Sequence, residues 1–378
     1  MSEQLLSINS KKISYKVTVQ TAPIKVLMLP DCRAANPYQT LLAGAIEQQG
    51  AIVCFPQGYR RGLPLLREVL AQRVNIVHLH WILPYIKGQH SWQKALYGIK
   101  LLIDIFLVQR LGVRVIWTVH NQVTHDTPFP KLEIWVRRQL AKQVDRIILH
   151  NAATLESIAQ TYGISPAKAQ VIPHGHYRDV YSSKISSTDA RRSLGLPLTG
   201  NIYLSLGLLR PYKGIEQLLT LWREHPEMAA GNTLLIAGKA GSAYAEELQK
   251  LTADLPSVVL MPEFIESERI HLFFSAATFA VLPYRNILNS GSLILAMSYG
   301  VPVIAPRLGN IPESLGAADQ LLYNADDQWG LLGVLKQSLD ADERSLSQHV
   351  VEACDRLGWD EIGRRTKQLY DEVLNANG

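Results

Sequence analysis

Short apolar runs alternate with longer helical patterns along most of the chain. In the first half the apolar runs occupy 24–30, 51–56, 75–81, 113–120, 145–151 and 169–175. Helical patterns lie between them, in stretches such as 37–49, 92–111, 131–143 and 152–162. Strands that are apolar at nearly every position are typical of a parallel sheet covered on both faces. The alternation therefore predicts an α/β fold with a doubly wound sheet and right-handed crossovers.

A segment rich in Ser, Gly and charge, at 179–200, interrupts this pattern and predicts a linker with a short helix. The alternation then restarts, with apolar runs at 201–207, 233–239, 257–263, 279–284, 302–306 and 320–323, and helices at 214–225, 243–253, 266–276, 291–299 and 328–339. We therefore predict two Rossmann-like domains, 1–180 and 181–358, that face a central cleft. A last helix, at about 359–375, could pack back on the first domain, and we assign 359–378 to it.

Composition narrows the class of protein. The 378 residues are 47% hydrophobic and 19% charged, which is typical of a globular protein. No apolar run reaches 18 residues without a charge, so we expect no transmembrane helix. The first residues, MSEQLLSINSKK, lack the layout of a signal peptide. Three cysteines are too few and too scattered for a disulfide framework or a zinc site, which favours a reducing cytosol.

The net charge of +5 is unevenly divided. Residues 1–180 carry 21 Lys and Arg against 10 Asp and Glu, a net of +11, and residues 181–378 carry 17 against 23, a net of −6. The two halves are therefore expected to meet different partners. For 92–111 itself we favour a buried crossover helix with solvated ends. The basic surface of the whole first domain is the better indication of an anionic membrane, and no aromatic-basic module indicates nucleic acid.

Two loops of the second domain suit a phosphate. In LSLGLLRPYKG a strand ends at Gly207, a loop carries Arg210 and Lys213, and a helix begins near Gly214. Cations and free amides at a strand end suit a diphosphate, although a solvated surface turn explains this loop equally well. The second loop follows Tyr284 and opens a helix through Asn289, Ser290, Gly291 and Ser292. Alone it reads as an ordinary N-cap, but two such loops in one sheet favour a binding site.

Titratable residues follow strands in the first domain. WTVHNQVTHD brings His120, His125 and Asp126 beyond a strand end, where they would face the cleft. A single such histidine is more often structural, but three groups within seven residues favour function. IPHGHYRDVY places His174 and His176 at the domain junction, where a polar hinge and donor contacts are equally good explanations. The chain has no P-loop, HExxH, paired CxxC or GxSxG motif.

Several blocks, in order along the chain, resemble a known family. They are NPYQTLL, VHLHW, TVHNQVTHD, HGHYRD, LLRPYKG and LPYRNILNSGSLILAMS. Together they resemble the GT-B glycosyltransferases, and most closely the β-mannosyltransferases of xanthan-type exopolysaccharide assembly, glycosyltransferase family 94, which is related to the family 4-like group. The combination is fairly specific for the group, though not for the sugar.

The resemblance implies a transferase that moves a sugar from a nucleotide diphosphate to a lipid-linked oligosaccharide in exopolysaccharide biosynthesis. It implies that the second domain holds the donor, through Gly207, Arg210, Lys213, Phe264, Tyr284, Asn289, Ser290, Gly291, Ser292, His174 and His176. The first domain would hold the acceptor, through Tyr38, His80 and Trp81, although Trp81 could equally be part of the core. The resemblance implies no cofactor and no required metal, in keeping with the missing DxD motif.

One departure bears on stereochemistry. Many retaining enzymes of this fold carry two glutamates eight residues apart, and the corresponding positions here are Ile287 and Leu295. An inverting enzyme fits better, and it needs a base for the acceptor hydroxyl. We favour Asp126, with His125 and His120 as rivals and Asp31 as a weaker candidate.

The expected donor is GDP-mannose, with a UDP-sugar as the alternative, and the expected acceptor is a polyprenyl-diphosphate-linked oligosaccharide. The expected location is the cytoplasm, peripheral on the inner face of the plasma membrane. Three other functions stay open: a retaining family 4-like enzyme that uses a UDP-sugar, a nucleotide-sugar epimerase, and a non-catalytic nucleotide-sugar-binding partner in polysaccharide assembly.

Overall fold

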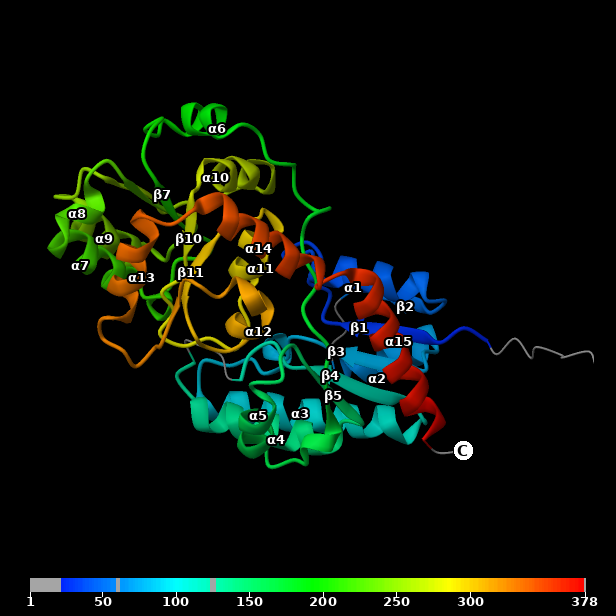
Figure 1. The fold of residues 1–378 in the computed structure, drawn as a ribbon. Helices are drawn as coiled ribbons and strands as arrows, with labels where there is room; N and C mark the ends of the chain where they lie inside the picture. The colour runs from blue at the N-terminus through cyan, green and yellow to red at the C-terminus, as the bar shows by residue number, and fades with distance from the viewer. Residues whose placement is uncertain (1–21, 59–61, 123–126, 377–378) are drawn as a thin grey trace, which may run out of the picture.

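The computed structural model describes residues 22–58, 62–122 and 127–376. They form two lobes, each built on a six-stranded parallel sheet with helices on both faces (Figure 1). The predicted α/β class with two Rossmann-like units is confirmed. Among the described residues, no helix has both the length and the apolar character needed to cross a bilayer.

The sheet of the N-terminal lobe has the strand order β2-β1-β3-β4-β5-β6. Its strands are β1 (Lys25–Leu29), β2 (Ile52–Cys54), β3 (Ile76–Leu79), β4 (Arg114–Thr118), β5 (Arg146–Leu149) and β6 (Ala169–Val171). Its helices are α1 (Tyr38–Gln48), α2 (Pro64–Gln72), α3 (Ser91–Arg110), α4 (Pro130–Gln143) and α5 (Leu155–Tyr162).

Strand β1 shows why these strands are apolar at successive positions. Leu27 and Leu29 pack against the layer of α2 to α5, whereas Val26 and Met28 pack on the opposite face. That opposite face is covered by α1 and by α15 (Trp359–Asn375), which lies along α1 (Figure 1). Tyr370 of α15 also hydrogen bonds to His78 of β3, with 2.7 Å between the hydroxyl oxygen and Nδ1. The last helix therefore completes the core of the first lobe.

The C-terminal lobe has the order β12-β11-β10-β7-β8-β9. Its strands are β7 (Ile202–Leu206), β8 (Thr233–Ala237), β9 (Val258–Met261), β10 (Phe279–Val281), β11 (Val303–Pro306) and β12 (Leu322–Tyr323). Its helices are α6 (Ser187–Leu194), α7 (Ile215–Glu224), α8 (Pro226–Ala229), α9 (Ser242–Thr252), α10 (Ile270–Ala276), α11 (Gly291–Ser298), α12 (Ile311–Leu315), α13 (Gly330–Leu339) and α14 (Glu343–Asp355). The chain leaves the adjacent strands β7 and β10 in opposite directions across the sheet. Ligands bind at such a switch point, beyond the strand ends.

Helix α3 differs from the expectation for 92–111. Its inner face is buried through Leu101, Ile105 and Val108. Its outer face leaves large apolar side chains in solvent, with Trp92 64% exposed and Ile103 50% exposed. The prediction of a buried crossover helix is therefore wrong for this outer face.

Candidate functional site

The loop after β7 brings a buried cation to the switch point. Gly207 has a φ of 125°, and a Cβ there would lie 2.9 Å from Ser292 Oγ and 3.0 Å from Lys213 Nζ. Glycine therefore suits both the backbone conformation and the close approach of these side chains. Lys213 is 7% exposed, and burial lowers the pKa of its ammonium to about 8.

Lys213 has few polar neighbours. Its Nζ lies 3.4 Å from Ser292 Oγ and 5.9 Å from the centre of the Tyr284 ring. Within the part of the chain that the structure describes, no carboxylate forms an ion pair with it. A buried cation without an anionic partner is unfavourable, and a phosphate oxygen would supply the missing charge.

The start of α11 lies beside Lys213. Ser290 caps this helix, since its Oγ accepts from the amide of Leu293 at 3.0 Å. The same Oγ lies 2.9 Å from the hydroxyl of Tyr284, and the Ser290 amide donates to Asn310 Oδ1 at 3.0 Å. Amides in the first turn of a helix have no partner within it. A helix start held rigidly next to a cation suits a diphosphate.

Two other predicted donor residues lie farther from this pair. Arg210 is half-buried, and its guanidinium lies beside the loop after β8, where a Cβ on Gly241 would be 3.9 Å from it. Phe264 follows β9 and is 60% exposed. The contact of Arg210 with the diphosphate and that of Phe264 with the nucleobase stay predictions.

Asn289 joins the two lobes. Its Nδ2 donates to the carbonyl oxygens of His120 at 2.8 Å and Val119 at 3.3 Å. Its Oδ1 accepts from Asn151 Nδ2 at 3.4 Å. A cavity of about 50 Å³ at this contact is lined by 120–122 and 286–289. The structure thus brings the loop after β4 against the loop that precedes α11.

The predicted base lies outside the described residues, as does one of its rivals. Both Asp126 and His125 fall within 123–126, so their roles stay predictions. The third candidate, His120, lines the interlobe cavity and belongs to a larger cluster.

Five histidine rings gather in and beyond β3 to β6. Four of them surround the ring of Tyr38, whose centre lies 4.7 Å from that of His174 and 5.1 Å from that of His120. The fifth, His78, packs on His80 with 4.2 Å between ring centres. All five are buried, and burial lowers the pKa of each imidazole: to about 4 for His150, to about 3 for His78 and His174, and well below the usual value for His80 and His120. The cluster is therefore uncharged at neutral pH.

Hydrogen bonds fix the tautomers of three of these rings. The carbonyl oxygen of Ile172 can only accept, so His150 Nδ1, 3.0 Å away, carries a hydrogen. His150 Nε2 must then accept from His120 Nδ1 at 3.4 Å, and His120 Nε2 from His80 Nδ1 at 3.3 Å. His80 Nε2 is left with a bare lone pair, in agreement with its being buried without a partner. His120 therefore has both nitrogens engaged, and its lowered pKa makes it a weak base.

The predicted acceptor residues belong to this cluster. Tyr38 and His80 are each 2% exposed, and the half-buried ring of Trp81 stacks on His120 with 4.3 Å between centres. These three residues pack on one another in the structure, and acceptor contact stays a prediction.

His174 and His176, which were predicted at the domain junction, make hydrogen bonds within the protein. The amide of His176 donates to the carbonyl oxygen of Leu357 at 3.1 Å, and its carbonyl oxygen accepts from Trp359 Nε1 at 2.7 Å. His174 Nδ1 donates to the carbonyl oxygen of Gly175 at 2.8 Å. Donor contacts by His174 and His176 stay predictions.

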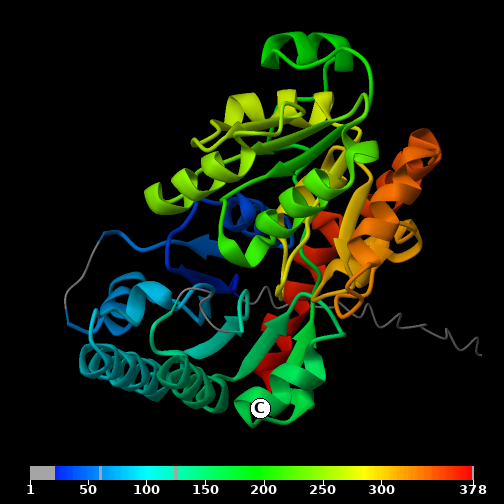
Figure 2. The same ribbon diagram turned by 90° about the vertical axis from the view of Figure 1, so that its left-hand side faces the viewer.

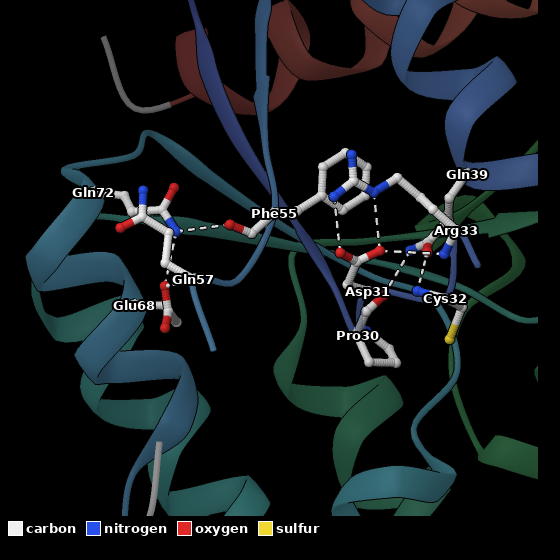
Figure 3. A network of polar contacts seen from close by, with 9 residues as sticks. All are labelled: Pro30, Asp31, Cys32, Arg33, Gln39, Phe55, Gln57, Glu68 and Gln72. Carbon is white, nitrogen blue, oxygen red and sulfur yellow. Dashed lines mark hydrogen bonds and ion pairs between the residues drawn. The ribbon is translucent and has the colours of Figure 1, made fainter. Parts of the chain in front are cut away.

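A larger cavity, of about 410 Å³, lies beyond β1, β2 and β3. Its walls include Pro30, Pro56, Pro64, Pro84, Tyr85 and Tyr97. Asp31 also lines it, and two Arg33 nitrogens each lie 2.9 Å from the Asp31 carboxylate, a contact that holds the pKa of that carboxyl below its usual value. Figure 3 shows Arg33 lying over the ring of Phe55 as it reaches Asp31. Asp31 is therefore an ionised group on an apolar wall.

Sequence reasoning missed two residues that join the lobes. Glu313, in α12, accepts from the amide of Ala152 at 2.6 Å, and Asn151 contacts Asn289. Neither residue belongs to a motif, and the partners are more than a hundred residues apart in the chain. Within the described ranges, no group of three or more His, Cys, Asp or Glu side chains is arranged to hold a metal ion.

Comparisons with known proteins span both lobes. Residues 52–177 match the family described as Glycosyltransferase Family 4, and residues 186–344 match Glycosyl transferases group 1. The GDP-mannose:glycolipid 4-beta-D-mannosyltransferase of Xanthomonas campestris pv. campestris is 27% identical over 350 residues, covering 91% of this chain and 90% of that protein.

Solved structures share the fold at lower identity. Sucrose-phosphate synthase from Thermosynechococcus elongatus has a TM-score of 0.71 at 19% identity, over 94% of this chain and 100% of that one. Anabaena Alr3699/HepE in complex with UDP has a TM-score of 0.71 at 15% identity, over 93% and 100%.

Proposed function

The chain is a GT-B glycosyltransferase, and on that basis we propose that it transfers mannose from GDP-mannose to a lipid-linked oligosaccharide in exopolysaccharide biosynthesis. The proposed reaction inverts the anomeric centre and forms a β linkage. Lys213 carries the donor part of the proposal, because it is a buried cation beside a helix start at the switch point. Lys213 and Arg210 would neutralise the leaving diphosphate, while the amides of Gly291 and Ser292 bind its oxygens.

Two observations support inversion and mannose over the alternatives. Ile287 is buried and Leu295 packs on the same hydrophobic core, so neither position offers the acidic side chain found in many retaining relatives. The Xanthomonas campestris relative named above is itself named for GDP-mannose and a β-linked product. A retaining enzyme that uses a UDP-sugar and a non-catalytic donor-binding protein are the outcomes against which the proposal is tested.

The donor is tested by thermal unfolding with GDP, UDP and their sugars, since a ligand that binds the folded state raises its stability. GDP and GDP-mannose are expected to raise the unfolding midpoint, and Lys213→Ala to abolish this shift. The matched control is Lys250→Ala, which removes an exposed lysine from α9 of the same lobe. A shift with UDP alone would contradict the mannose assignment.

The base is tested by Asp126→Asn. We expect this variant to keep the GDP shift and to lose transfer by about 10²–10⁴-fold, the usual contribution of a general base. His125→Gln and His120→Gln serve as parallel variants, measured by release of GDP with a polyprenyl-diphosphate oligosaccharide. Normal turnover in Asp126→Asn would assign the base elsewhere, and donor binding without turnover in the wild type would favour the non-catalytic alternative.

A further inference from the structure

Helices α2, α3 and α4 pack side by side in the layer that covers one face of the N-terminal sheet (Figure 2). We propose that this surface, the outer faces of these three helices, docks on an anionic lipid bilayer. The inference deepens the proposed function, because it names where a lipid-linked acceptor would be met. The surface itself is argued from burial and charge alone.

The apolar part of the surface is a regular stripe along α3. Trp92, Leu96, Ile99, Ile103 and Phe106 follow one another at intervals of four and three residues, which places them on one side of the helix. Each is at least 44% exposed. Leu70 of α2 and Trp135 of α4 are also exposed large apolar side chains, on the two helices that pack beside α3. A surface helix normally carries polar residues on its outer side, so a contiguous patch of this kind indicates an interaction site.

The charge on the surface has one sign. The three helices, which the structure describes in full, contain three acidic residues, Glu68, Asp104 and Glu133, and all are buried. The Asp104 carboxylate accepts from the amides of Leu65 and Leu66, at 2.9 and 2.8 Å. Glu133 forms an ion pair with Lys94 at 2.5 Å. The exposed charges of these helices are therefore all positive: Arg67, Arg110, Lys131, Arg138 and Lys142.

This combination favours a bilayer over a second copy of the chain. Exposed tryptophans and aliphatic side chains among basic residues are typical of helices that lie in the membrane interface. Anionic headgroups would complement the cations, whereas a symmetric dimer through this face would set like charges against each other. Helix α3 also lines the larger cavity through Tyr97, Lys100 and Leu101, so a docked bilayer would border that cavity.

The test is sedimentation of the full chain with vesicles. We expect binding to phosphatidylcholine vesicles that contain about 30% phosphatidylglycerol, and weaker binding at high salt or without the anionic lipid. The double variant Ile103→Glu, Phe106→Glu is expected to bind at least about tenfold more weakly, because it places two acids on the stripe. The matched control is Leu198→Glu, Trp329→Glu, which changes two exposed apolar residues of the C-terminal lobe.

The outcomes separate this inference from the proposed function. Equal vesicle binding by both double variants, or equal binding with and without anionic lipid, would overturn the docking surface. The docking surface would also be overturned if the wild type did not bind vesicles but formed a dimer in sedimentation velocity, and the Ile103→Glu, Phe106→Glu variant did not form this dimer. Circular dichroism and the GDP-induced thermal shift confirm that each variant is folded. If GDP does not raise the unfolding midpoint of the wild type, the proposed donor is rejected. The vesicle measurements still test the docking surface in that case.

Discussion

Because Lys213 is buried without a counter-charge, its ammonium loses its proton at a lower pH than an ordinary lysine does. Its folded pKa is about 8, against 10.5 for an ordinary lysine. Between those values the unfolded state binds more protons, so this residue makes stability rise with pH from about 8 to 10.5. A bound diphosphate has the opposite preference, since it favours the charged ammonium.

We therefore predict that GDP binding weakens above pH 8, by about tenfold for each pH unit until the pKa of the complex is reached. Titration calorimetry between pH 7 and 9.5 measures this profile. Lys213→Arg is the control, because a guanidinium stays charged over that range and should give a flatter profile. The same slope in both proteins would assign the titration to another group.

The histidine cluster predicts a different pH dependence. Its pKa values lie below the unfolded value of 6.5, so the unfolded state binds more protons below that pH. Stability is expected to be constant with respect to these groups above pH 6.5 and to fall as the pH drops towards 4. Each ring contributes about 1.4 kcal/mol per pH unit in this window.

His174→Phe tests this prediction, because it removes one titrating ring and keeps an apolar side chain in its place. Urea unfolding at several pH values should give a shallower loss of stability between pH 6 and 4.5 than in the wild type, whatever the absolute stability of the variant. An unchanged slope would mean that His174 is already protonated in the folded state.

At the scale of elements, the start of α11 depends on one hydroxyl. Ser290→Ala removes the N-cap and the contact with Tyr284, so it is expected to lower the free energy of unfolding by about 0.5–2 kcal/mol. Tyr284→Phe keeps the cap and removes only the tyrosine hydroxyl, and should cost less. Chemical denaturation compares the two, and a larger loss in Tyr284→Phe would show that the cap is not the main contribution.

Some elements could be predicted from the sequence because their signals are local. Helix α11 was expected at 291–299 from its Ser and Gly start, and α15 was expected at about 359–375, close to its observed bounds. Helices α2 and α14 were not expected. Helix α2 has only nine residues, and α14 contains Ser, His and Val, which are mediocre helix formers. Packing on the lobes, which is not a local signal, stabilises both.

The exposed face of α3 could not be predicted for a related reason. Periodicity shows which residues of a helix share a side, but both sides of α3 are apolar. Only the packing with α2 and α4 decides that Ile105 is buried and Ile103 is exposed.

At the scale of the whole molecule, the site depends on contacts between the lobes. Strand ends indicated where Lys213, Ser292 and His120 lie within each sheet, but Asn151 and Glu313 act through partners in the other lobe. Side chains that join distant segments leave no spacing pattern in a single sequence. The candidate donor residues could therefore be found from sequence, and the residues that set the interlobe geometry could not.

Glu313→Ala is predicted to loosen this contact. The amides of Ala152 and Ala153 lose their acceptor, so their peptide should exchange hydrogen faster in mass spectrometry. Glu361→Ala is the control, since it removes an exposed carboxylate of α15 that pairs with Arg364 and not with these amides. Unchanged exchange at residues 151–155 would show that Glu313 does not hold the lobes together.

The position of α15 has a consequence for the order of folding. Because this helix covers α1 and Tyr370 fills the core beneath it, the N-terminal lobe encloses residues from both ends of the described chain, and the C-terminal lobe is in effect an insertion within it. During synthesis the inserted lobe emerges complete before the last helix does. Until the last helix emerges, α1 alone covers that face of the first lobe's sheet, and a chain stopped before Trp359 would leave the α15 side of the face exposed permanently.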